Sequence, residues 1–96
     1  MLYSVLQVLP TNDYKVYIYF SNGEVKLYDA TELLDKGVFK VLKDRKKFMD
    51  SCTVLNNTLA WDLKGNFDPY ECLDIDPEML YENSVKTEDP LSSSSI

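Results

Sequence analysis

The sequence predicts a small α+β domain with an antiparallel sheet built from a three-stranded meander and a second hairpin, together with two or three short helices. Alternating apolar and polar residues flank Asn22-Gly23, and a second such pattern flanks Asn56-Asn57. Short segments with capping residues follow each hairpin. Ninety-six residues with 45% hydrophobic content are enough for one core but too few for two. We therefore expect one domain over residues 1–83 and a mobile, Ser-rich tail over residues 84–96.

The first hairpin spans residues 14–29 and turns at Asn22-Gly23. A two-residue type I′ loop requires φ > 0 at both central residues, and Asn and Gly tolerate this. Such a loop would place Phe20 opposite Val25, and each outward step would add one opposed pair. The face expected to enter the core carries Val16, Ile18, Phe20, Val25 and Leu27. The face expected to be amphipathic carries Lys15, Tyr17, Tyr19, Glu24, Lys26 and Tyr28.

Two further stretches read as strands. Residues 2–9 are rich in β-branched and aliphatic side chains and are stopped by Pro10, so they would pair with the first hairpin to complete the meander. Residues 51–62 repeat the hairpin pattern around Asn56-Asn57, where both central residues would again take φ > 0. The shared apolar face of this second hairpin is predicted to carry Cys52, Val54, Leu59 and Trp61.

Short helices are predicted from their first residues. The expected N-cap carboxylates are Asp29, Asp44 and Asp76. They would begin helices at about residues 30–36, at residues 45–49 and at Pro77. Gly37 would end the first helix in a left-handed conformation, and Phe48 would point from the second helix into the core.

The net charge of −6 is unevenly distributed along the chain. Residues 1–50 hold seven acidic and eight basic side chains, whereas residues 51–96 hold nine acidic and two basic ones, so the two parts carry +1 and −7. An acidic field repels phosphate backbones, so we expect no direct nucleic-acid binding and favour a basic protein surface as partner. We expect no membrane association and a cytoplasmic location, because the chain has neither a long apolar stretch nor the pattern of a signal peptide.

The residues that most enzymes use are scarce. The chain has no His, and Cys52 and Cys72 form neither a C-x-x-C pair nor a zinc ligand set. We therefore expect a non-enzymatic protein without a cofactor or a bound metal. The alternative is a small cation-dependent enzyme that uses the carboxylates of residues 68–78, although their spacing fails the EF-hand pattern.

Partner binding is predicted at two places. Tyr is favoured at interfaces, where its ring is buried and its hydroxyl stays wet, so the tyrosines of the amphipathic face are candidates. The acidic segment that ends in the last helix is the second candidate. Together the candidate residues are Tyr17, Tyr19, Tyr28, Asp74, Asp76, Glu78 and Tyr81. The sequence does not decide the oligomeric state, and a weak homodimer is one alternative.

Four sequence blocks, taken in order, resemble the bacterial family called domain of unknown function 2442. The blocks are Y-x-V-x-I-x-F-S-N-G-E-V-K-L-Y-D, G-V-F-x-x-L-K-D followed by Phe48, N-N-T-L-A-W-D and L-D-I-D-P-E-M-L-Y-E. The resemblance covers about residues 3–83. It implies a compact α+β fold similar to the N-terminal domain of a Nitrosomonas protein, and it supplies no catalytic residue.

The resemblance also implies an interaction module. Some members of the family are fused to a helix-turn-helix domain, and others are encoded beside a small basic protein in pairs that look like toxin–antitoxin systems. This chain differs in its longer G-N-F-D-P-Y-E-C segment between Trp61 and Leu73, and its 96 residues carry no DNA-binding domain. We therefore expect the antitoxin-like or regulatory half of a two-gene pair, which would meet a small basic protein encoded nearby.

Overall fold

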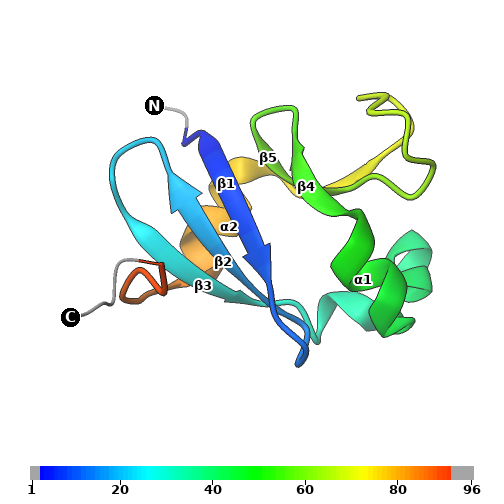
Figure 1. The fold of residues 1–96 in the computed structure, drawn as a ribbon, viewed down its shortest axis with the longest axis horizontal. Helices are drawn as coiled ribbons and strands as arrows, with labels where there is room; N and C mark the ends of the chain where they lie inside the picture. Colours follow the sequence, from blue (N-terminus) through cyan, green and yellow to red (C-terminus); the bar gives the residue numbers. More distant parts are fainter. Residues whose placement is uncertain (1–2, 92–96) are drawn as a thin grey trace.

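Two antiparallel sheets enclose one core in the computed structural model, which describes residues 3–91 (Figure 1). The first sheet has the strand order β1-β2-β3-β7, with β1 Val5–Pro10, β2 Lys15–Phe20, β3 Val25–Asp29 and β7 Val85–Lys86. The second has the order β4-β5-β6, with β4 Cys52–Leu55, β5 Thr58–Trp61 and β6 Leu73–Asp74. The predicted α+β class, with a meander and a second hairpin, is confirmed.

The β2–β3 hairpin turns through three residues, whereas the sequence predicted two. The Phe20 N–H donates to the Glu24 carbonyl at 2.9 Å, and the Gly23 N–H donates to the Phe20 carbonyl at 3.0 Å. Gly23 has φ +92°, so the loop is a tight turn followed by one left-handed residue. Asn22 instead accepts a 3.0 Å hydrogen bond from the Glu24 N–H. The predicted pairing of Phe20 with Val25 is therefore wrong by one residue.

This shift exchanges the two faces of β3. Ile18 lies opposite Lys26, and Tyr17 lies opposite Leu27. Opposed residues of an antiparallel pair project to the same side, so the predicted placement of the β3 side chains is reversed. The β3 residues on the core side are Lys26 and Tyr28. We call the opposite side the outer face, which comprises Gln7, Leu9, Lys15, Tyr17, Tyr19, Val25, Leu27, Asp29 and Val85.

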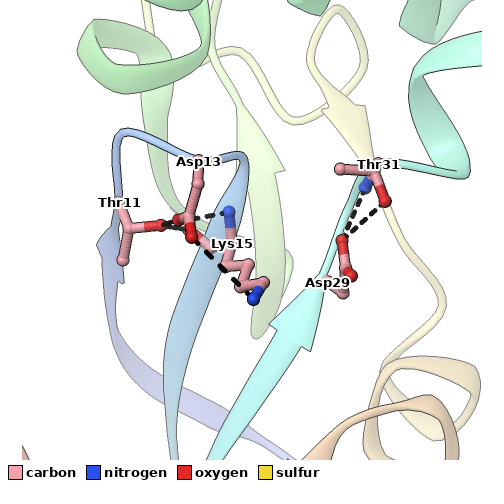
Figure 2. A network of polar contacts seen from close by, with 5 residues as sticks. All are labelled: Thr11, Asp13, Lys15, Asp29 and Thr31. Carbon is pink, nitrogen blue, oxygen red and sulfur yellow. Dashed lines mark hydrogen bonds and ion pairs between the residues drawn. The ribbon is translucent and has the colours of Figure 1, made fainter.

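The end of the first sheet is closed by two polar turns (Figure 2). Between β1 and β2, the Thr11 hydroxyl donates to the Asp13 carboxylate, and the Thr11 N–H donates to the Lys15 carbonyl at 2.8 Å. At the end of β3, Asp29 accepts hydrogen bonds from the N–H and the hydroxyl of Thr31 at 3.0 and 2.7 Å. Asp29 thus forms a local turn and does not cap the helix that the sequence predicted.

Four short helical segments complete the fold. They are the 3₁₀ helices η1 (Leu33–Asp35) and η2 (Gly37–Lys43) and the α-helices α1 (Arg45–Ser51) and α2 (Pro77–Asn83). The predicted helix at 30–36 is only a 3₁₀ turn, and residues 38–42, for which the sequence predicted no helix, lie within η2. The caps of the α-helices are confirmed: Asp44 accepts from two backbone N–H groups of α1, and Asp76 accepts from the Met79 N–H.

The second hairpin has the predicted register. Cys52 lies opposite Trp61 and Val54 lies opposite Leu59. Both loop residues take φ > 0, at 55° for Asn56 and 63° for Asn57, as a type I′ loop requires. All of β5 is buried, because β6, which the sequence did not predict, pairs along its other edge.

The core lies between the inner face of the first sheet, the second hairpin and the helices. Its buried residues are Val5, Val16, Ile18, Phe20, Ala30, Leu34, Leu42, Phe48, Leu59, Trp61, Ile75 and Leu80. Phe48 of α1 points inward as predicted, with its ring centroid 5.6 Å from that of Trp61. The two sheets are tied together where the Val5 N–H donates to the Asn57 carbonyl at 2.9 Å. Helix α2 lies behind β1–β3 in Figure 1 and covers their inner side.

The first sheet continues past residue 83, where the sequence analysis ended the domain. Strand β7 pairs with β3, the Thr87 N–H donates to the Val25 carbonyl at 3.0 Å, and the Tyr19 hydroxyl donates to Asp89 at 2.6 Å. The predicted boundary therefore separates a strand from its own sheet. Residues 92–96 of the predicted tail lie outside the described residues. Within residues 3–91, no helix has the length and apolar character needed to cross a bilayer.

Candidate functional site

Two adjoining hollows lie beside η1 and α2, and we refer to them together as the groove. Their volumes are about 340 and 200 Å³, and they share Leu33, Lys36 and Met79. The larger hollow is also lined by Tyr28, Asp29, Thr31, Glu32 and Asn83. The smaller one is also lined by Phe39, Asp74, Ile75 and Asp76. Segments about forty residues apart in the sequence thus form one concave surface.

The smaller hollow has an apolar floor. Leu33 comes from η1, Phe39 from η2 and Ile75 from the segment between β6 and α2. Met79 of α2 is 54% exposed, while the next residue, Leu80, is fully buried in the core. An unbranched thioether side chain adapts its shape to a partner, so an exposed Met in a groove suits recognition.

The rim of the groove is acidic. Its lining residues carry the carboxylates of Asp29, Glu32, Asp74 and Asp76 and one ammonium group, that of Lys36. The hydrogen bonds that Asp29 accepts from Thr31 lower the pKa of its carboxyl below the ordinary value. The groove therefore presents negative charge around an apolar floor.

Two of the rim carboxylates are held in place by hydrogen bonds. The side-chain amide of Asn56 donates to Asp74 at 2.9 Å and to the Pro69 carbonyl at 3.1 Å. The Asp76 carboxylate accepts from the Met79 N–H at 3.4 Å as the cap of α2. A carboxylate has about four acceptor positions, so each can still accept hydrogen bonds from a bound cationic group.

The comparison with known families covers most of the chain. The family model described as "Protein of unknown function (DUF2442)" matches residues 5–86. The chain belongs to the DUF2442 family. The match begins at the first residue of β1 and ends at the last residue of β7, so it spans both sheets and the whole groove. No curated protein and no solved structure matches the chain.

The seven candidate residues of this DUF2442 chain fall on different surfaces. Tyr28, Asp74 and Asp76 line the groove. Glu78 is exposed in the first turn of α2, next to Met79. The remaining three lie elsewhere: Tyr17 and Tyr19 are on the outer face and Tyr81 packs inside the fold. The groove therefore contains three of the seven candidates, and Tyr17, Tyr19 and Tyr81 lie away from it.

The side chain of Tyr81 makes contacts within the fold. Its ring stacks on Tyr3 with a centroid distance of 3.8 Å, and the ammonium group of Lys26 lies 3.7 Å from its centroid. Its hydroxyl donates a hydrogen bond to the Glu24 carboxylate, which raises the pKa of Tyr81. These contacts occupy the ring and the hydroxyl, so Tyr81 holds α2 against the first sheet of this DUF2442 fold.

Sequence reasoning missed most of the groove, because only Tyr28, Asp74 and Asp76 of its twelve lining residues were candidates. Leu33, Lys36, Phe39 and Met79 were not candidates, nor were the carboxylates of Asp29 and Glu32. Only Met79 had a local signal, because it is an apolar residue in the first turn of α2, three residues after the Asp76 cap. The other residues acquire a shared role only through contact between η1, η2 and α2.

Four of the five acidic residues of segment 68–78, namely Asp68, Glu71, Asp74 and Asp76, make hydrogen bonds or ion pairs within the protein. Asp68 accepts from the Tyr70 N–H at 2.9 Å, and Glu71 lies 3.3 Å from the Lys64 ammonium. In the described part of the chain, no three His, Cys, Asp or Glu side chains are grouped so that they could hold a metal ion. The cation-dependent alternative therefore gains no ligand set from this DUF2442 structure.

The two thiols are poor nucleophiles. Burial raises the pKa of Cys52 to about 12. The pKa of Cys72 is also raised, first by burial and then by the nearby Asp74 carboxylate. Because the thiolate is the reactive form, neither side chain is activated at neutral pH.

Proposed function

We propose that this DUF2442 protein is a non-enzymatic protein-interaction module whose groove binds a basic segment of a partner protein. The observation that carries the proposal is the combination of an apolar floor with an acidic rim in one concave surface. In this proposal the protein is the antitoxin-like or regulatory half of a two-gene pair, and its partner is a small basic protein encoded nearby.

The charge distribution supports a basic partner. Most of the negative charge lies in residues 51–96, and this part of the chain supplies Asp74, Asp76 and the exposed Glu78 beside the groove. Complementary charge accelerates encounter and disfavours acidic or phosphate-bearing partners. In this proposal the acidic rim selects a basic partner.

The apolar floor supports affinity. Rim charges in contact with water contribute little, because salt and solvent screen them. Full burial of one aliphatic or aromatic partner side chain contributes about 1.5–3 kcal/mol. The 200 Å³ hollow between Phe39, Ile75 and Met79 has room for such a side chain. A segment with an apolar residue between Lys or Arg residues would use both features.

The test is co-expression and titration of the protein with the product of the neighbouring gene. We expect a complex whose dissociation constant rises when NaCl is increased from about 50 to about 500 mM, because exposed charges are screened. The double variant Glu32→Gln/Asp76→Asn removes two rim charges, and Asn remains a good helix cap. It should weaken binding about three- to tenfold, because each exposed charge pair contributes at most about 1 kcal/mol.

Glu82→Gln/Glu88→Gln is the matched control. Both residues are exposed and outside the groove lining, and the change in net charge is the same. It should alter the dissociation constant less than about twofold. The proposal is wrong if no complex forms, or if the control weakens binding as much as the groove variant does.

A further inference from the structure

We propose that the outer face of the first sheet is a self-association surface, on which a second copy of this chain packs face to face. This surface lies on the opposite side of the sheet from α2 and the core (Figure 1). The proposal is independent of the partner that binds the groove, because it concerns different residues and a different occupant.

An apolar row crosses the outer face from edge to edge. Leu9 of β1 lies opposite Tyr17 of β2, Tyr17 lies opposite Leu27 of β3, and Leu27 lies opposite Val85 of β7. None of the four is buried, and Val85 at the edge is 63% exposed. Cross-strand neighbours of this kind form a continuous apolar strip, which in a lone protein would face water.

A second row runs beside the first. Gln7, Tyr19 and Val25 lie opposite one another across β1, β2 and β3. Burial, together with the hydrogen bond that the Tyr19 hydroxyl donates to Asp89, raises the pKa of Tyr19 to about 12. Tyr19 thus stays neutral at physiological pH and presents its ring as part of the apolar surface. In residues 3–91, no helix lies over either row (Figure 1).

The charges favour a second copy over a charged partner. Two molecules with a net charge of −6 repel each other, so they can associate only where little of that charge lies. The strand residues of the outer face include one cation and one anion, Lys15 and Asp29, both at the end shown in Figure 2. Asp89 adds one further anion beside Tyr19, so the face carries little net charge. The groove, with its acidic rim, would bring like charges together. The outer face is therefore the surface suited to self-association.

The available area predicts a weak dimer. Three strands about 4.8 Å apart, with about five residues each at about 3.3 Å per residue, and the two-residue strand β7 give a patch of about 270 Å². Because side chains project from each patch, its accessible surface is larger than its flat area. Two such patches would bury on the order of 1,000 Å² of accessible surface in total, which is the lower limit for a specific interface. Two sheets would then pack about 10 Å apart, and the dimer should form only at high protein concentration.

The experiment is sedimentation equilibrium of the full chain at concentrations from about 10 µM to about 1 mM, the range in which an interface of this size should dissociate. We expect a reversible monomer–dimer equilibrium that high salt does not weaken. Tyr17→Lys places a charge at the centre of the row and should weaken dimerisation at least about tenfold. Leu27→Thr keeps the β-propensity of the strand and should weaken it in the same direction, so it tests the proposal if Tyr17→Lys does not fold.

Met79→Ser is the control, because it removes an exposed apolar side chain from the groove and leaves the outer face unchanged. It should leave the dimerisation constant unaltered. The proposal is overturned if the protein stays monomeric up to about 1 mM, or if Met79→Ser weakens the dimer while Leu27→Thr does not. Binding of the basic partner is measured in a separate titration, so failure of one proposal leaves the other standing.

Discussion

The ammonium group of Lys26 lies 3.7 Å from the ring centroid of Tyr81 and donates a 2.6 Å hydrogen bond to the Tyr81 carbonyl oxygen. This pair joins β3 to α2 on the inner side of the first sheet. The same ring stacks on Tyr3, and its hydroxyl donates to Glu24. A lysine thus occupies a position on the core face because its ammonium group contacts a carbonyl oxygen and an aromatic ring.

Lys26→Met should destabilise the protein by about 1–2 kcal/mol, because Met retains the apolar stem but loses the hydrogen bond and the cation–π contact. Lys47→Met is the control, since Lys47 is exposed on α1. It should change stability by less than about 0.5 kcal/mol. Urea midpoints of the two variants decide this, and equal midpoints would contradict the assigned position of Lys26.

Stability should depend on pH through Glu24. The hydrogen bond from Tyr81 is the main reason that the pKa of Glu24 falls below its ordinary value of 4.5. A lowered folded-state pKa stabilises the protein above the unfolded-state value, and this stabilisation is lost as the pH falls through the folded-state value. Tyr81→Phe should therefore lower the urea midpoint at neutral pH and have a smaller effect at a pH below the folded-state pKa of Glu24, where the carboxyl is protonated in both states.

For this comparison Tyr70→Phe serves as the control, because Tyr70 is 94% exposed. Removal of the Tyr70 hydroxyl should shift the urea midpoint little at either pH. A Tyr81→Phe effect of the same size at both pH values would show that ring packing, and not the hydrogen bond to Glu24, accounts for the loss.

Gly23→Ala should destabilise the protein by about 1–2 kcal/mol, because an L-residue is strained in the left-handed conformation. Gly23 has φ +92°, and an added Cβ would meet no atom within 4 Å, so backbone strain is the whole cost. Ser21→Ala in the same loop should be nearly neutral, since Ser21 does not take positive φ. Denaturant titration of both variants checks the three-residue loop, which is wrong if the two changes have equal effects.

Asp62→Ala should destabilise the protein by about 1–3 kcal/mol, the cost of leaving partly buried donors without acceptors. The Asp62 carboxylate accepts from the Gly65 N–H at 3.1 Å and from the Phe67 N–H at 2.8 Å. Its side chain lies at the boundary of the core, 9% exposed. Amide hydrogen exchange of residues 63–72 should accelerate in the variant, and unchanged exchange would exclude this role. Glu82→Ala, at an exposed position of α2, should leave both stability and exchange unaltered.

Local rules predicted the second hairpin and the α-helix caps. The register of Cys52 with Trp61 follows from a type I′ loop, in which Asn56 and Asn57 both take φ > 0. The Asp44 and Asp76 caps depend only on neighbouring backbone N–H groups. These features need no information from distant residues, so they could be predicted.

The first hairpin was mispredicted because Asn-Gly suits two loops. Gly serves a two-residue type I′ loop and also the left-handed position of a three-residue loop, and the two differ by one residue in register. Each register buries a different face of β3. The contacts that accompany the observed register are those of Lys26 with α2 and of Tyr28 with the core, and both involve residues far away in the sequence.

The sequence by itself determined the fold class, the second hairpin, the capped helices and the acidity of residues 51–96, because each follows from composition or from groups a few residues apart. Only the tertiary structure decided which face of β3 is buried, where Tyr81 lies and that a groove exists. The groove requires residues 28–39 to meet residues 74–83, and the outer face requires four strands in register. Such contacts depend on the combined packing of the whole chain, which no local pattern of residues encodes.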